Sequence, residues 1–144
     1  MMKYFQIYEL VDEKTWRTIG DKAWELFKPD ALIMLDNFRE FIGVPCSVNN
    51  WYGATGGYAT RQFSGFRPED CPIGAKHSQH KLGNAFDVHV KDMNADDARK
   101  RILADKDNPL LLNITRLESG VAWVHMDAMV LPAGLKRIHV FADV

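Results

Sequence analysis

Side chains of the kinds that bind metal ions occur in three separate segments of the chain, and a fold that uses them must bring these segments together. The segments are residues 64–67 (SGFR), 78–87 (SQHKLGNAFD) and 123–127 (WVHMD). They supply two imidazoles, a carboxylate of metal-binding type and, upstream, a guanidinium that could hold an anion. A catalytic zinc usually takes three protein ligands of mixed His and Asp/Glu type and keeps one position for water. The pattern therefore predicts a zinc site of the kind found in hydrolases.

The predicted ligands are His80, Asp87 and His125. Gly83, between the first two, permits a tight backbone path, so a loop with His80 can fold back onto a strand that carries Asp87. Alternate side chains of a strand share a face, so His125 and Asp127 are expected to point the same way. If their strand lies beside the strand of Asp87, the three ligands meet on one rigid sheet.

Four further residues leave alternatives open. His89 shares a strand face with Asp87 and could replace it as a ligand or lie behind it. His77 could reach a substrate or be a solvated loop residue, and His139 is expected to be structural. Asp127 suits a partner that orients a metal-bound imidazole, or it is a surface carboxylate.

Length and charge place the chain among ordinary globular proteins. Its 144 residues suit one domain over 1–144, and 47% hydrophobic and 26% charged residues are common values. Lys and Arg number 18 against 19 Asp and Glu, which gives a formal net charge of −1. Bulk charge therefore gives no support to a nucleic-acid or membrane partner. The sequence leaves the oligomeric state unknown.

The N-terminus and the cysteines bear on the compartment. Residues 1–10 lack an apolar h-region and a small-residue cleavage site, so we expect cytoplasmic synthesis without a signal peptide. No apolar run approaches the roughly 20 residues that cross a bilayer. The spacing of Cys46 and Cys71 is not that of a zinc knuckle, and we expect two free thiols.

Helical patterns come first along the chain and strand patterns later. One helix is predicted from Asp30, a plausible N-cap, to Gly43, a shorter one starts at Asp21 and ends before Pro29, and a capped helix covers 94–103. Strands are predicted at 61–64, 85–90, 114–118, 121–127 and 136–141. This order predicts an α+β fold, a small antiparallel sheet with the N-terminal helices packed against it.

Residues 49–60 are rich in glycine, polar and aromatic side chains. This composition suits a loop over a binding site, or an ordinary turn cluster with its aromatic rings against the core. In the first case Trp51 and Tyr52, together with Tyr58, line the wall of a substrate cleft.

The three segments resemble those of the zinc D-Ala-D-Ala carboxypeptidase and L-Ala-D-Glu endopeptidase family, whose fold is shared with the Hedgehog signalling domain. The family pattern is a Ser-Gly-Tyr-Arg-like stretch, then Ser-x-His-x-x-Gly-x-Ala-x-Asp, then Trp-Val-His-x-Asp, and the chain has close variants in this order. Short phage-encoded members look closest in layout. The resemblance implies a Hedgehog/DD-peptidase-like fold with Zn²⁺ bound by His80, Asp87 and His125.

The resemblance also implies roles for residues around the metal. Arg67 matches the arginine that stabilises the polarised carbonyl or grips a substrate carboxylate, tasks that suit a guanidinium. Its alternative is a structural ion pair with Asp70 or Glu69. Ser78 matches a serine that contacts the site or supports its loop, and Trp123 is expected beside the substrate.

One position departs from the family pattern. The family places a general base, Glu or His, three residues before the last histidine ligand, and this position is Ala122, which cannot move a proton. Glu118 is the nearest substitute, since a hairpin turn at 119–120 could bring it to the metal. A solvated carboxylate at the end of a strand is the alternative.

The function implied by the resemblance is zinc-dependent hydrolysis of an amide bond in peptidoglycan stem peptides, by an enzyme that acts at the cell wall. Either a carboxypeptidase or an endopeptidase fits. Ala122 favours the alternative, a non-catalytic zinc module that binds the wall or is structural. A nuclease or another metal hydrolase is a third reading, against which the near-neutral charge argues.

Overall fold

The computed structural model describes residues 2–53 and 60–142. Within them lie three α-helices, α1 (Glu13–Ile19), α2 (Pro29–Ile42) and α3 (Ala95–Ala104). The strands are β1 (Cys46–Ser47), β2 (Ala85–Val90), β3 (Arg116–Ser119), β4 (Val124–Asp127) and β5 (His139–Ala142). Short 3₁₀ helices are η1 (Ile7–Glu9), η2 (Gly20–Leu26), η3 (Trp51–Gly53), η4 (Gln79–Leu82) and η5 (Pro109–Leu111).

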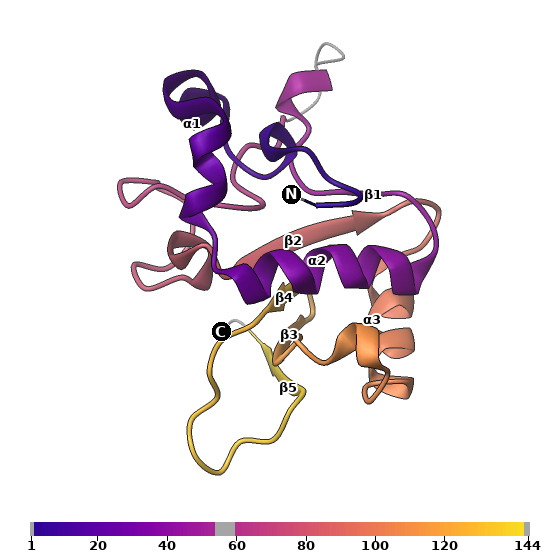
Figure 1. Cartoon of the computed structure of the whole chain (residues 1–144). Coiled ribbons are helices and arrows are strands. Elements are labelled where there is room, and N and C mark those ends of the chain that lie inside the picture. The colour runs from indigo at the N-terminus through magenta and orange to yellow at the C-terminus, as the bar shows by residue number, and fades with distance from the viewer. Residues whose placement is uncertain (1, 54–59, 143–144) are drawn as a thin grey trace.

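The strands form one five-stranded sheet in the order β1-β2-β4-β3-β5 (Figure 1). The mixed α and β content is consistent with the predicted α+β class. The prediction of an antiparallel sheet is wrong at one edge, where β5 runs parallel to β3. The long loop 128–138 causes this, because it carries the chain past β3 before β5 begins (Figure 1).

Most predicted elements exist, and their bounds differ by a few residues. The strand predicted at 85–90 is confirmed as β2, and the last three predicted strands begin two or three residues later. The strand predicted at 61–64 is wrong, since this segment makes only isolated backbone bonds such as Asp87 N–H to the Ser64 carbonyl (2.7 Å). The predicted N-cap at Asp30 is also wrong. The helix begins at Pro29, which has no N–H to leave unsatisfied in the first turn.

Besides short 3₁₀ helices, one strand and one α-helix were not predicted. The strand β1 is too short to show an alternating pattern, and it pairs with the end of β2. The helix α1 begins at Glu13, and the carboxylate of its N-cap, Asp12, accepts a hydrogen bond from the Thr15 N–H at 3.0 Å. The short helix expected from Asp21 is the 3₁₀ helix η2.

The two faces of the sheet have opposite characters. One face packs against α2, which lies across β2 (Figure 1), and buries apolar side chains that alternate along the strands. These residues are Phe86, Val88, Leu117, Val124 and Met126. The other face carries Asp87, Glu118, His125 and Asp127, which are buried as well. Packing of the apolar face against the core therefore holds in place the same strands that carry the polar side chains on the other face.

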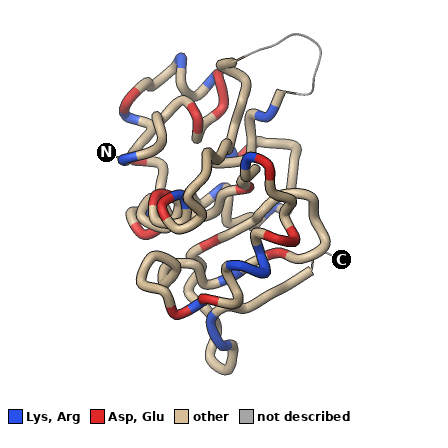
Figure 2. The backbone as a smooth tube through the Cα atoms, turned by 90° about the vertical axis from the view of Figure 1, so that its right-hand side faces the viewer, with Lys and Arg blue, Asp and Glu red and all other residues tan. Residues whose placement is uncertain are grey.

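Charged residues of both signs are mixed along the backbone. Figure 2 shows basic and acidic residues interspersed along the backbone, without a continuous basic stripe in the described part of the chain. No α-helix within residues 2–53 and 60–142 combines the length and apolar character that a membrane span requires.

Gly83 positions the short helix η4 that carries His80. It ends this helix in the left-handed region at φ 66°, and its carbonyl accepts the Lys28 N–H at 2.9 Å. A Cβ atom at this position would overlap the carbonyl oxygen of Leu26. Gly43 ends α2 in the same region at φ 77°, but a Cβ there would meet no atom within 4 Å.

These two glycines offer a matched test. Gly43→Ala is expected to lower the free energy of unfolding by about 1 kcal/mol, the cost of a left-handed residue with a side chain. Gly83→Ala is expected to cost about 3 kcal/mol or more, because backbone must also move. Urea denaturation followed by tryptophan fluorescence measures both, and equal losses would contradict the packing at Gly83.

Candidate metal centre

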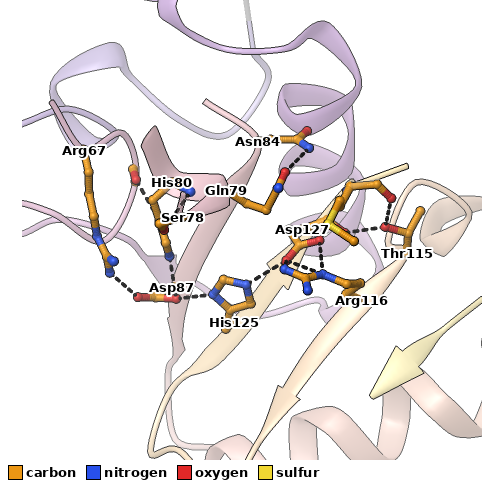
Figure 3. Close-up of polar contacts among 12 residues, drawn as sticks. Arg67, Ser78, Gln79, His80, Asn84, Asp87, Thr115, Arg116, His125 and Asp127 are labelled. Carbon is orange, nitrogen blue, oxygen red and sulfur yellow. Dashed lines mark hydrogen bonds and ion pairs between the residues drawn. The ribbon is translucent and has the colours of Figure 1, made fainter. Parts of the chain in front are cut away.

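The three predicted ligands come together on the polar face of the sheet. Strands β2 and β4 pair so that Asp87 lies opposite His125, and η4 brings His80 over them. His80 Nε2 lies 3.2 Å from Asp87 Oδ1, and His125 Nδ1 lies 2.9 Å from the same oxygen (Figure 3). The three residues are 3%, 7% and 7% exposed, and one ligand atom from each lies within 4.8 Å of the others.

A backbone carbonyl sets the orientation of His80. Its Nδ1 lies 2.8 Å from the carbonyl oxygen of Gly65. Since a carbonyl only accepts, Nδ1 carries the hydrogen, and Nε2 turns its lone pair toward Asp87. Gly65 itself packs against the backbone of Leu10, where a Cβ atom would overlap the Leu10 carbonyl oxygen.

Asp127 sets the orientation of His125. Its Oδ2 lies 2.9 Å from His125 Nε2, and both its oxygens accept hydrogen bonds from Arg116, at 2.8 to 3.1 Å. Burial alone would raise the pKa of Asp127, but the bonds from His125 and Arg116 lower it. The ionised carboxylate can only accept, so Nε2 carries the hydrogen and Nδ1 faces Asp87. Asp127 is fully buried, which excludes the surface alternative.

Three hydrogen-bond acceptors therefore face one point. His80 Nε2, Asp87 Oδ1 and His125 Nδ1 have no hydrogen between them when both imidazoles are neutral. Such a cluster needs positive charge, either a proton on a ring or a metal ion. Two donors of a tetrahedral metal bound at about 2 Å lie about 3.3 Å apart, close to the distances found. The group could thus hold a metal ion.

The pKa values of the metal-free protein reflect this need. Burial disfavours the charged forms of both Asp87 and His125. The hydrogen bonds and opposite charges around them outweigh this effect on their pKa values. The pKa of Asp87 lies well below its usual range because both histidines bond to its carboxylate. The pKa of His125 rises to about 9, since Asp127 and Asp87 stabilise the imidazolium.

Arg67 completes the surroundings of Asp87. Its Nη2 donates to Asp87 Oδ2 at 3.2 Å, and its Nε donates to the Phe63 carbonyl at 2.7 Å. The alternative ion pair with Asp70 or Glu69 is not the one that forms. Arg67 holds Asp87 so that Oδ1 faces the histidines, and its predicted contact with substrate stays a prediction.

A cleft of about 470 Å³, which we call the metal cleft, opens over the centre. The three ligands line it, and so do four residues predicted around them: Arg67, Ser78, Glu118 and Trp123. Ser78 also supports the loop, because its hydroxyl accepts the His80 N–H at 3.2 Å. The cleft thus gathers most of the predicted site.

Two predicted substrate contacts lie elsewhere among the described residues. Trp51 donates its indole N–H to the Val11 carbonyl at 2.8 Å, and the Tyr52 ring packs on Tyr8 with centroids 4.9 Å apart. Neither lines the metal cleft. Both rings cover the N-terminal segment, as in the turn-cluster alternative. Tyr58 lies outside the described residues.

Glu118 and Ala122 differ in what they face. Glu118, on β3, is buried and lines the metal cleft, so it is not a solvated strand-end carboxylate. Ala122 lines another cavity, beside α3 and Arg99. The position at which the resemblance implies a general base therefore does not line the metal cleft.

The other histidines do not join the centre. His77 is exposed and lines the metal cleft. His89 is half-buried and lines a neighbouring cavity, and burial and the charge of Arg61 lower its pKa. His139 lies in β5, next to Arg116 in the register.

Arg116 and Phe141 belong to the site but were not predicted. Arg116 holds Asp127, and its guanidinium stacks on the Phe141 ring at 4.2 Å from the centroid. The same ring meets the His125 ring edge-on at 5.6 Å. Strand alternation could have indicated Arg116, two residues before Glu118. No signal in the sequence indicates Phe141.

Comparison of the chain with models of known families, with curated proteins and with solved structures finds no match. The interpretation of the centre therefore rests on its own geometry and on the three segments that carry the resemblance.

Asp127 offers a test of how the centre is held. Asp127→Asn is expected to weaken zinc binding about 10- to 100-fold, because an amide does not fix the His125 tautomer as a carboxylate does. Asp107 is an exposed aspartate that forms an ion pair with Arg137, so Asp107→Asn is the matched control and should leave zinc binding unchanged. Competition with a chromophoric chelator measures both affinities, and an unchanged affinity in Asp127→Asn would contradict this role.

The raised pKa of His125 predicts a pH dependence for the metal-free protein. Stability from a group whose pKa is raised on folding is complete below its unfolded value, 6.5, and is lost as pH rises through about 9. The free energy of unfolding should fall in this window by about 3 kcal/mol. Urea denaturation in EDTA across this range measures it, with His125→Gln expected to flatten the curve. Stability that is constant or rises with pH would refute the prediction.

Proposed function

We propose that this protein is a zinc-dependent peptidase that hydrolyses an amide bond in peptidoglycan stem peptides. One observation carries the proposal: three buried acceptor atoms, on His80, Asp87 and His125, converge beneath an open cleft. The resemblance of the three segments to the D-Ala-D-Ala carboxypeptidase and L-Ala-D-Glu endopeptidase family supports the substrate class.

The donor set supports zinc as the metal. Two imidazole nitrogens and one carboxylate oxygen are common zinc ligands, and three protein ligands leave a fourth position for catalysis. When bound, Zn²⁺ lowers the pKa of a coordinated water from 15.7 to about 7 and polarises a carbonyl as a Lewis acid. The ligands lie at the wall of the cleft, so this fourth position would face the substrate.

Glu118 is the proposed general base. It takes a proton from the attacking water and returns it to the leaving amine, a task that suits a carboxylate in the same cleft as the ligands. Positioned acid–base groups contribute typically about 10²- to 10⁴-fold to the rate.

The other residues orient the substrate and the ligands. Arg67 and Asp127 fix Asp87 and His125 through the contacts they make. Arg67 also lines the cleft, where its positive charge would stabilise the oxygen of the scissile carbonyl as negative charge develops. Ser78 and Trp123 are the proposed substrate contacts. The cleft volume falls in the range of sites that bind small molecules, about 300 to 1,000 Å³.

A non-catalytic zinc module is the second candidate, and Ala122 favours it. The usual base position holds a residue without a titratable group, and it lines a different cavity. Such a module would bind metal and wall peptides without cleaving them.

The test combines metal analysis with digestion of purified peptidoglycan fragments. His80→Ala and Asp87→Ala are expected to lose both zinc and hydrolysis, because two ligands seldom hold the ion. Glu118→Gln is expected to keep zinc at one ion per chain and to lose activity at least about 100-fold. Glu69→Gln, at an exposed glutamate, is the control and should behave as the wild type.

Mass spectrometry of the digested muropeptides identifies the bond that is cut. Zinc that stays stoichiometric in both His80→Ala and Asp87→Ala would overturn the ligand assignment. Full activity of Glu118→Gln would eliminate Glu118 as the base. Bound zinc and bound wall fragments without any cleavage would establish the non-catalytic module.

A further inference from the structure

A second cavity, which we call the Arg61 cavity, adjoins the metal cleft. Its volume is about 290 Å³. Four residues line both spaces: Arg67, Ile73, Asp87 and Trp123. The ion pair of Arg67 with Asp87 therefore belongs to the wall that the two share. A peptide bound at the metal could extend past this wall into the Arg61 cavity.

Arg61 is fixed in orientation by neutral partners. Its Nε donates to the Val48 carbonyl at 3.1 Å, and its Nη2 donates to the Ser47 hydroxyl at 2.8 Å. No ion pair joins Arg61 to an acidic side chain within residues 2–53 and 60–142. Burial lowers the pKa of Arg61, as expected for a partly buried cation. Its positive charge is thus pre-oriented and not neutralised by a neighbouring carboxylate.

The other groups of the Arg61 cavity leave this charge dominant. Asp87 is the acidic residue in the lining, and its Oδ2 already accepts from Arg67. His89 lines the cavity beside Arg61, because β1 pairs Ser47 with His89. Trp123 and Phe63 add aromatic surface. The lining suits a ligand with a negative group on a short apolar stem.

We propose that the Arg61 cavity binds a carboxylate of the peptide substrate, on a residue close to the bond held at the metal. The substrate class is then an acidic peptide, and Arg61 selects it through charge-assisted hydrogen bonds. The peptide nature of the ligand rests on the proposed function, whereas the preference for a carboxylate rests on Arg61 alone.

Two probes that differ in one group test this. They are the tetrapeptide L-Ala-γ-D-Glu-L-Lys-D-Ala and its counterpart in which the glutamate α-carboxylate is an amide. Calorimetric titration into the zinc-loaded and the metal-free protein should show about tenfold tighter binding of the acid in both forms. Arg61→Gln should abolish this preference, and Arg61→Lys should keep part of it. Arg17→Gln, on the exposed face of α1, should leave it unchanged.

Equal affinity of the wild type for the two probes, or an unchanged preference in Arg61→Gln, overturns the proposal. Where Arg61→Gln does not fold, the Arg61 Nε–H resonance of the wild type decides, since it should shift with the acid and not with the amide. Cleavage is scored separately on the purified peptidoglycan fragments, because the tetrapeptide lacks a D-Ala-D-Ala bond. A preference for the acid that depends on Arg61, without any cleavage, would refute the proposed peptidase activity and support the carboxylate site. Cleavage without this preference would support the peptidase activity and refute the carboxylate site.

Discussion

The carboxylate of Asp87 lies between two imidazole nitrogens that have no hydrogen to donate when both rings are neutral, and the rest of the polar face depends on how this conflict is resolved. The Gly65 carbonyl accepts a hydrogen bond from His80 Nδ1, and the Asp127 carboxylate accepts one from His125 Nε2. Each outer contact turns an imidazole lone pair inward. Because acceptors that face one another repel, the centre needs positive charge among its three atoms, and either an imidazolium proton or a metal ion can supply it.

The fold supplies the rigidity that this arrangement requires. Phe86 and Met126 alternate with Asp87 and His125 along paired strands, so the packing of the first two against the core sets the position of the last two. The Phe27 ring stacks on Phe86 with centroids 5.6 Å apart, close to where the chain enters α2. A shift of register by one residue would bury the ligands in the apolar core, so hydrophobic packing also protects the centre.

Local pattern, together with the resemblance, was sufficient to predict the three residues that come together at the candidate centre and the strands β2 and β4. The spacing of His80 and Asp87 about Gly83, and the alternation of His125 with Asp127, depend on short stretches of chain.

The features that the sequence did not predict depend on contacts between distant segments. The parallel β5 follows from the path of a long loop, and the two-residue β1 exists because β2 offers it an edge. The ion pair of Arg67 joins segments 20 residues apart, and nearby Asp70 and Glu69 were the partners that sequence proximity favoured. Trp51 and Tyr52 pack on a segment about 40 residues away, a contact that composition does not encode.

Anomalous diffraction at the zinc absorption edge, from crystals of the protein grown with Zn²⁺, would locate the metal. We expect one strong peak bounded by His80 Nε2, Asp87 Oδ1 and His125 Nδ1, at about 2.0 to 2.2 Å from each. A map without a peak at this point, or with imidazoles turned so that these nitrogens face apart, would contradict it.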